Sequence, residues 1–199
     1  MANLDIRTPR FYCDLISYQL SRGKVQNGNF DVLAETGTIT GISSGVEADL
    51  FDMRPLNLVT FDTTDNSGND HVIINIDTGD TTLRQGFIAI LNHNMATADA
   101  KMRVYSSDTE SDLTSVNLGG SSVTLTEVVN GNPSGALATP RHDGSTIVTF
   151  TERHEQYFGI QFEGDNSNTF DTSTAMTIGC ILIGEYFDMP VSPDMSVKR

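Results

Sequence analysis

The sequence has 199 residues, of which 38% are hydrophobic and 19% are charged, and its formal net charge is −14. A chain of this length forms one sizeable domain with a buried core. Its acidity repels nucleic-acid backbones and anionic membranes at long range, so we expect no direct nucleic-acid partner. No apolar run approaches the roughly 20 residues of a membrane-spanning helix, so we expect no membrane insertion. The polar N-terminus predicts that there is no secretory signal peptide and that synthesis takes place in a cytoplasm.

Small polar residues and glycine are abundant and tryptophan is absent, which favours a loop-rich all-β protein. The two cysteines, Cys13 and Cys180, both lie in apolar runs that resemble strands. They are either buried free thiols, the usual state of such residues, or a single bridge between the first and last strands. Their spacing excludes a cysteine-rich metal site.

In the first third of the chain, strand signals alternate with loops. Residues 1–9 are expected to form an N-terminal arm that ends at Pro9. A strand is predicted over Phe11–Leu15 and a short one over Thr38–Ile42. An apolar segment at residues 50–54 precedes Pro55, and another strand is predicted over Leu56–Phe61.

The remaining strand signals come at regular intervals, and a turn is predicted over residues 130–135. The predicted strands are His71–Asp77, Gly86–Leu91, Lys101–Ser106, Val123–Val128, Ser145–Thr151, Tyr157–Phe162 and Met176–Phe187. Nine or ten short strands without a clear helix predict an all-β, jelly-roll-like antiparallel β-sandwich over residues 10–187. Residues 188–199 are expected to form a C-terminal extension.

The segment Gly86–Asp108 is predicted to form a strand, a turn and a second strand. Its first part is a continuous apolar run, which is typical of a strand buried on both faces. The polar triplet Asn92, His93 and Asn94 follows directly. These side chains either hold a structural corner by bonding to nearby backbone or contact a ligand.

Two other motifs suggest chemistry at loops. Gly41–Gly45 matches the G-x-S-x-G pattern of hydrolases, but that motif needs a strand before the serine and a helix after it, and neither is predicted. We therefore expect a protein that is not an enzyme. Asp62, Asp65 and Asp70 lie in an acidic loop that could hold calcium, although the glycine and glutamate positions of an EF-hand are not matched. The alternative for this loop is a solvated turn, and no other cofactor is expected.

Three segments together resemble a known family. The sequence IAILNHNMATADAKMRVYSSD (residues 88–108) resembles the central hairpin of galactose-binding-domain-like, or discoidin-type, jelly rolls, and is most similar to versions in bacteriophage virion proteins. Residues 157–166 and 176–195 resemble the closing strands of the same domains. The opening residues 9–23 resemble the start of tail-associated or minor structural proteins of marine phages.

This resemblance implies a domain located in a virion. It predicts a non-enzymatic structural protein that mediates subunit assembly in the tail, or where the tail joins the portal or a fibre. We expect other virion proteins as partners and a homo-oligomer. Some members of the family bind sugars, so a carbohydrate-binding module for host-surface glycans is the first alternative, and a capsid decoration protein is the second.

The end of the chain supports an assembly role independently of the resemblance. An apolar, proline-stiffened segment that follows the last core strand is predicted either to lie against a neighbouring subunit or to pack on its own sandwich. The predicted assembly contacts are Tyr186, Phe187, Met189, Pro190, Val191 and Pro193.

Overall fold

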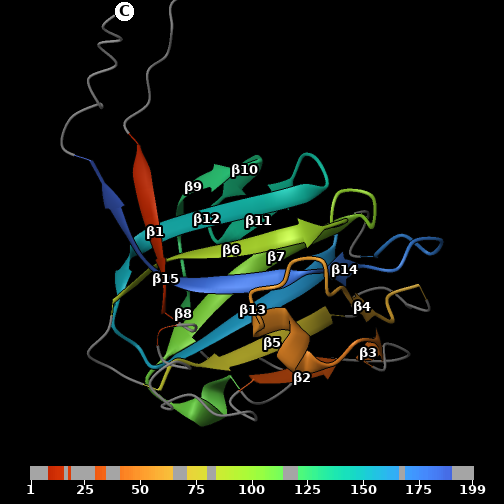
Figure 1. Ribbon diagram of the computed structural model, residues 1–199, viewed down its shortest axis with the longest axis horizontal. Coiled ribbons are helices and arrows are strands. Elements are labelled where there is room, and N and C mark those ends of the chain that lie inside the picture. Colours follow the sequence, from red (N-terminus) through yellow and green to blue (C-terminus); the bar gives the residue numbers. More distant parts are fainter. Residues whose placement is uncertain are drawn as a thin grey trace, which may run out of the picture.

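The computed structural model describes residues 9–15, 18, 30–34, 41–64, 71–79, 84–113, 121–165 and 169–189 (Figure 1). The strands of the first half are β1 (Arg10–Asp14), β2 (Phe30–Ala34), β3 (Ile42–Ser44), β4 (Val59–Phe61), β5 (His71–Asp77), β6 (Gln85–His93) and β7 (Ala100–Ser107). The strands of the second half are β8 (Ser121–Ser122), β9 (Leu125–Val129), β10 (Gly131–Ser134), β11 (Leu137–Pro140), β12 (Gly144–Arg153), β13 (Tyr157–Gly164), β14 (Thr177–Ile178) and β15 (Cys180–Asp188). The short 3-10 helices are η1 (Glu47–Phe51) and η2 (Glu110–Asp112).

Two antiparallel sheets face each other across the core. A five-stranded sheet has the order β1-β15-β6-β12-β9, and a seven-stranded sheet has the order β10-β11-β7-β13-β5-β2, with β8 paired to β7. A small sheet of β14, β4 and β3 lies at one end. The predicted all-β sandwich is therefore confirmed. Among the described residues, no helix is long and apolar enough to cross a bilayer.

The alternation of side chains explains how the sheets enclose the core. In β7 the buried positions are Ala100, Met102, Val104 and Ser106, and the residues between them are partly exposed. Strand β6 is buried along most of its length, as its apolar run predicts. Its residues Ile88 and Ile90 belong to the core between the sheets.

On the outer face of β6, Phe87 is covered by a residue of the first strand. The ring of Phe87 is fully buried and meets the Tyr12 ring edge-on, with the centroids 4.9 Å apart. Register pairing aligns Phe87 with Gly184 of β15, and Tyr12 with Tyr186. Tyr12 thus encloses Phe87 on the face of β6 that points away from the core.

The segment Gly86–Asp108 forms the predicted strand, turn and second strand, but the hairpin that the family resemblance implies for it is wrong. Strand β6 pairs with β12 and β15, whereas β7 pairs with β11, β13 and β8, so the two lie in different sheets. The segment between them carries the chain from one sheet to the other (Figure 1). Both strands have the expected hydrophobic pattern, but that pattern does not specify which strand each one pairs with.

Other predicted elements differ in extent. Residues 56–58 do not join the strand over Val59–Phe61, and Leu56 is 88% exposed. The turn predicted over residues 130–135 is largely strand β10, which pairs with β11 around Gly135. The last predicted strand is interrupted at Gly179, so that β14 joins the three-stranded sheet and β15 joins the five-stranded one.

Smaller differences concern the first part of the chain. The strand predicted over Thr38–Ile42 is represented by β3 from Ile42 onwards, while residues 38–40 lie outside the described residues.

Both cysteines are free thiols, which contradicts the bridge alternative. Cys180 is buried as predicted, but Cys13 is exposed because its side chain points to the solvent face of β1.

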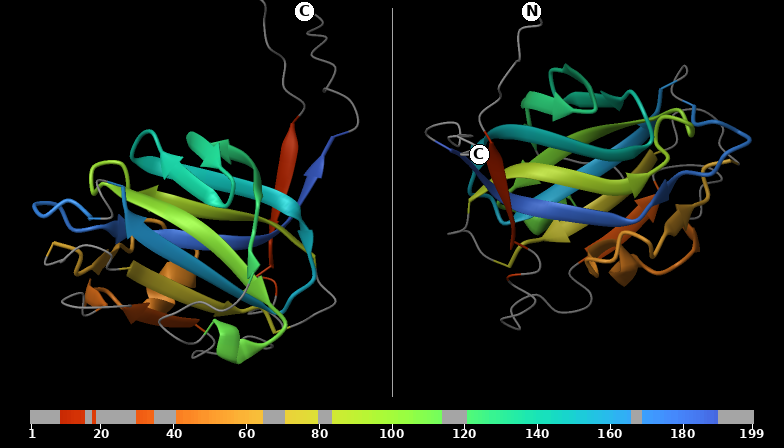
Figure 2. Two further views of the ribbon diagram at one scale, coloured as in Figure 1. Left: turned by 180° about the vertical axis from the view of Figure 1, so that it is seen from behind. Right: turned by 45° about the horizontal axis from the view of Figure 1, so that its top comes forward.

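The two ends of the described chain form one unit, which we call the terminal ribbon: β1 paired with residues 184–188 of β15. It extends beyond the end of the five-stranded sheet (Figures 1 and 2). The two strands approach each other closely at Gly184, where a Cβ atom would lie 2.0 Å from the carbonyl oxygen of Cys13. Only glycine permits this approach. The pairing continues past β15, because the Met189 N–H donates to the Pro9 carbonyl at 2.9 Å.

Candidate functional site

The polar triplet after β6 is bonded to neighbouring backbone. Asn92, which has a φ of 51°, donates from Nδ2 to the Pro55 carbonyl at 2.7 Å. Asn94 donates from Nδ2 to the Ala175 carbonyl at 2.9 Å and accepts the Thr177 N–H at 2.7 Å. The two amides thus join the end of β6 to the chain before β4 and to the start of β14.

His93 is buried within the same corner. Its Nδ1 accepts the Met95 N–H at 3.1 Å, so Nε2 carries the ring proton and donates to Thr146 Oγ1 at 2.9 Å. Burial lowers the pKa of His93 to about 4, against the smaller opposite effect of Asp143. All three side chains are therefore engaged in the way that the structural-corner hypothesis describes.

The two sequence motifs at loops supply little chemistry. The Ser43 hydroxyl donates to the Thr60 carbonyl at 3.3 Å, and Ser43 lies within strand β3 rather than at a strand-to-helix turn. Of the three calcium candidates, Asp62 is described, whereas Asp65 and Asp70 lie outside the described residues. Within the described part of the chain, no group of three histidine, cysteine or acidic side chains is arranged to hold a metal.

A cleft of about 550 Å³ lies between the terminal ribbon and strands β9 and β12. Its walls are mainly polar, with three threonine hydroxyls and four carboxylates. Sequence reasoning did not find this site, since its residues come from five strands that are far apart in the chain. We call it the ribbon cleft; its polar and charged lining residues are Arg10, Thr126, Glu127, Thr149, Thr151, Glu152, Glu185, Tyr186 and Asp188.

Arg10 holds the ribbon against the sheet. Its guanidinium donates to Asp188 at 2.6 Å through Nε and to Glu127 of β9 at 2.8 Å through Nη1. It also lies 4.3 Å from the centroid of the Tyr186 ring. Hydrogen bonding to Asp188 raises the pKa of Arg10, and the same contact lowers the pKa of Asp188. The cation is thus fixed by three partners on two strands.

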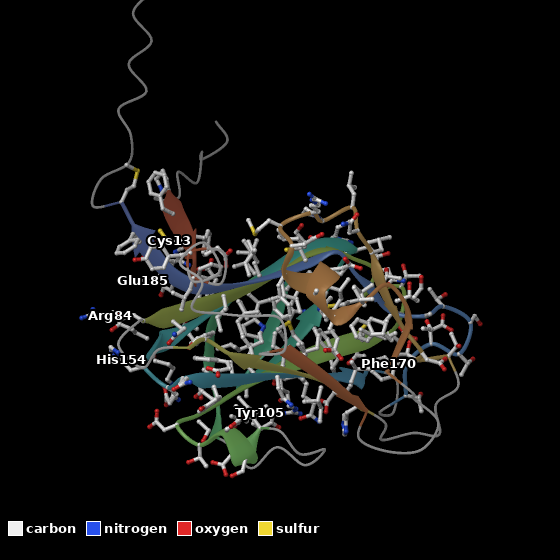
Figure 3. All side chains as sticks on the ribbon, turned by 60° about the horizontal axis from the view of Figure 1, so that its bottom comes forward. Cys13, Arg84, Tyr105, His154, Phe170 and Glu185 are labelled. Carbon is white, nitrogen blue, oxygen red and sulfur yellow. The ribbon has the colours of Figure 1, made fainter. Side chains whose placement is uncertain are left out.

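Hydroxyl groups form the opposite wall. Thr126 and Thr149 are hydrogen-bonded to each other through their Oγ1 atoms at 2.9 Å, and Thr151 is exposed. Beside them, Glu152 pairs with Arg84 at 3.2 Å and with His154 at 3.2 Å. Figure 3 shows Arg84, His154 and Glu185 at the same end of the sandwich. This wall offers hydrogen-bond donors and acceptors to a ligand.

The residues predicted as assembly contacts are divided between two faces of the ribbon. Tyr186 faces the sheet and its ring packs on Gly86, where a Cβ would lie 3.1 Å from Cε1. Phe187 is 50% exposed and lies in register with Phe11, which is 57% exposed. Met189 is half-buried; Pro190, Val191 and Pro193 lie outside the described residues.

The architecture, a jelly-roll-like antiparallel β-sandwich, is similar to that of solved structures described as carbohydrate-binding modules. A chitosan-binding module from a chitosanase/glucanase of Paenibacillus sp. IK-5 matches with a TM-score of 0.51 and 16% identity, over 79% of this chain and 96% of that one. At this identity, the likeness establishes the fold alone.

Two further solved structures are similar at lower scores. The C-terminal domain of a Bacteroides fragilis chitobiase has a TM-score of 0.47 and 11% identity, over 83% of this chain and 98% of that one. A CBM32 module of Clostridium perfringens in complex with GalNAc-β-1,3-galactose has a TM-score of 0.45 and 11% identity, over 79% and 96%. No family model and no curated protein matches the sequence.

Proposed function

We propose that this protein is a non-catalytic carbohydrate-binding module that recognises surface glycans of a host cell. The observation that carries the proposal is the ribbon cleft, which is lined mainly by polar groups. It lies on a fold that this protein shares with a protein described as a chitosan-binding module. Its volume of about 550 Å³ lies within the range of small-ligand sites.

The chemistry of the cleft suits a polyhydroxylated ligand. Threonine hydroxyls both donate and accept hydrogen bonds, and carboxylates accept them from sugar hydroxyls. Bonds to ionised carboxylates are stronger than bonds between neutral groups. Thr151 and Glu152 of β12 are both exposed and both line the cleft, so a hydroxyl and a carboxylate are available to one ligand.

A glycan array followed by calorimetric titration of each hit tests the proposal. We expect at least one glycan to bind, and Thr126→Val together with Thr151→Val to weaken that binding by about tenfold. Thr172→Val, at an exposed position outside the cleft, is the matched control and should bind as the wild type does. An array without hits, or hits that survive the double substitution, would contradict the proposal.

A second candidate function is subunit assembly in a phage virion, through a homo-oligomer or through other virion proteins. The observation that favours it is the aromatic pair Phe11 and Phe187, which are in register on the two strands of the ribbon and are both about half exposed. Mass photometry should then show an oligomer that dissociates in the Phe11→Ser/Phe187→Ser variant. A wild-type monomer would count against this function. Negative-stain labelling of particles would distinguish a tail location from a decorated capsid.

A further inference from the structure

We propose that the ribbon cleft selects sugars that carry protonated amines, such as oligomers of glucosamine. This inference rests on the carbohydrate-binding function proposed above and adds the charge of the ligand to it. It follows from the balance of charged groups around the cleft, from the packing of Tyr186 and from the hydroxyls of the opposite wall.

The cleft has an excess of negative charge. Four carboxylates, those of Glu127, Glu152, Glu185 and Asp188, face one guanidinium, that of Arg10. Arg10 is already bound to two of the four, at 2.8 Å and 2.6 Å.

The neighbourhood of the cleft does not cancel this excess. Arg84 pairs with Glu152 from outside the cleft, but its side chain is 56% exposed, so solvent weakens this neutralisation. Counting Arg84 still leaves more carboxylates than cations. A cationic ligand therefore gains Coulomb energy on entering the cleft, whereas an acidic sugar is repelled.

Of the aromatic residues that line the cleft, Tyr186 does not offer a free face for a neutral sugar. The Tyr186 ring has the Arg10 guanidinium 4.3 Å from its centroid, and the backbone of Gly86 packs closely against it. Stacking of a sugar on this ring would have to displace Arg10. At Tyr186, the attraction available to a ligand is therefore polar and ionic rather than aromatic.

Hydroxyls and carboxylates share the same walls, which matches the two kinds of group on an amino sugar. Thr126 and Thr151 are exposed and can bond to sugar hydroxyls. The carboxylates of Glu152 and Glu185 can each accept charge-assisted hydrogen bonds from an ammonium group. A neutral or N-acetylated sugar can form the hydrogen bonds to the threonine hydroxyls, but it has no ammonium group to form charge-assisted bonds with the carboxylates.

The experiment compares a glucosamine hexamer with an N-acetylglucosamine hexamer by calorimetric titration. The pH is chosen below the pKa of the sugar amines but above the ordinary carboxyl pKa of about 4. We expect the amino hexamer to bind at least tenfold more tightly, with an affinity that falls as salt is added. Repeating the titration above the amine pKa should remove the preference.

Two charge-neutral variants assign the effect to the cleft. Glu152→Gln and Glu185→Gln should each reduce the affinity for the amino hexamer by about tenfold and leave the N-acetylated hexamer unaffected. Glu110→Gln removes the same charge from η2, at the bottom of Figure 1 and outside the cleft, and should change neither affinity. Thermal unfolding of each variant verifies that it is folded.

The possible results separate this inference from the function on which it rests. Equal affinity for both hexamers, or an amine preference that both variants retain, overturns the inference while glycan binding stands. Binding of neither hexamer, together with a glycan array that has no hits, overturns both. Hits restricted to acidic glycans overturn the inference alone.

Discussion

Nε of Arg10 lies 2.6 Å from Oδ1 of Asp188, an ion pair between residues 178 positions apart that joins the first strand to the end of the last one. The same guanidinium reaches Glu127 on β9 and covers the ring of Tyr186. The Arg10 side chain therefore links both strands of the ribbon to β9 at the cleft.

The first prediction concerns this side chain. Arg10→Gln should lower the free energy of unfolding by about 1 kcal/mol, because it removes a partly exposed ion-pair network and a cation–π contact. Urea denaturation measures the change, which should shrink as salt is added. Arg84→Gln is the control, since the Arg84–Glu152 pair is exposed on both sides and should contribute almost nothing. Equal losses in the two variants would show that Arg10 has no special role.

The second prediction is that acid destabilises the fold through His93. Its pKa is about 4 in the folded protein and 6.5 is its ordinary value, so the unfolded state binds more protons at any pH between the two. Stability should therefore fall as the pH decreases through this window, by up to about 3 kcal/mol for this residue. Above pH 6.5 the residue should contribute no slope.

Comparison of two variants isolates the histidine. His93→Gln should have a flatter dependence of unfolding free energy on pH between 6.5 and 4, although it is less stable at neutral pH because the corner loses its bonds. His142→Gln, at an exposed position, should keep the wild-type slope. Burial raises the pKa of Glu163, but His71, Arg103 and Lys101 together lower it below its ordinary value, and carboxylates of this kind act equally in both variants. If His93→Gln and the wild type had the same dependence of unfolding free energy on pH, His93 would not be the cause of the acid destabilisation.

The third prediction tests the close approach of the two ribbon strands at Gly184. Gly184→Ala places a Cβ where the Cys13 carbonyl lies, 2.0 Å away, so β1 must move. We expect a loss of stability of about 2 kcal/mol or more and weaker glycan binding, because the ribbon is one wall of the cleft. Gly135→Asn is the control: a Cβ there meets nothing within 4 Å, and asparagine tolerates its positive φ.

The fourth prediction is a pair of opposite effects at neighbouring residues. The Ser106 hydroxyl is buried and has no hydrogen-bond partner among the described residues. Ser106→Ala should therefore stabilise the protein by about 1 kcal/mol. The Ser107 hydroxyl instead donates to Asp112 at 2.7 Å and accepts the Thr109 N–H at 3.0 Å, so Ser107→Ala should destabilise by a similar amount. Thermal unfolding of both variants measures whether each one is more or less stable than the wild type.

Much of the strand content follows from local pattern. The bounds predicted for His71–Asp77 agree with β5, and the alternation in Ser145–Thr151 marks part of β12. The apolar run in Gly86–Leu91 correctly indicates a strand enclosed on both faces. These features depend on the order of residues within a few positions, which the sequence displays directly.

Which strands pair, and which side chains form the cleft, depends on residues that are far apart in the sequence. Local sequence pattern does not predict either. The expected hairpin over Gly86–Asp108 is a crossover between sheets, because β6 finds its partners in β12 and β15. Likewise, the sequence predicts Tyr186 as an assembly contact, whereas in the structure it packs beneath Arg10 in a cleft.

The sequence by itself determined the all-β class, the acidic character and the position of most strands, since these follow from composition and from the two-residue period of a pleated strand. Only the tertiary structure decided that Arg10 lies beside Glu127 and Asp188, and that threonines and carboxylates from β9, β12 and β15 enclose one cleft. The physical reason is that sheet partners are selected by burial and register across the whole chain, and no local pattern encodes that choice.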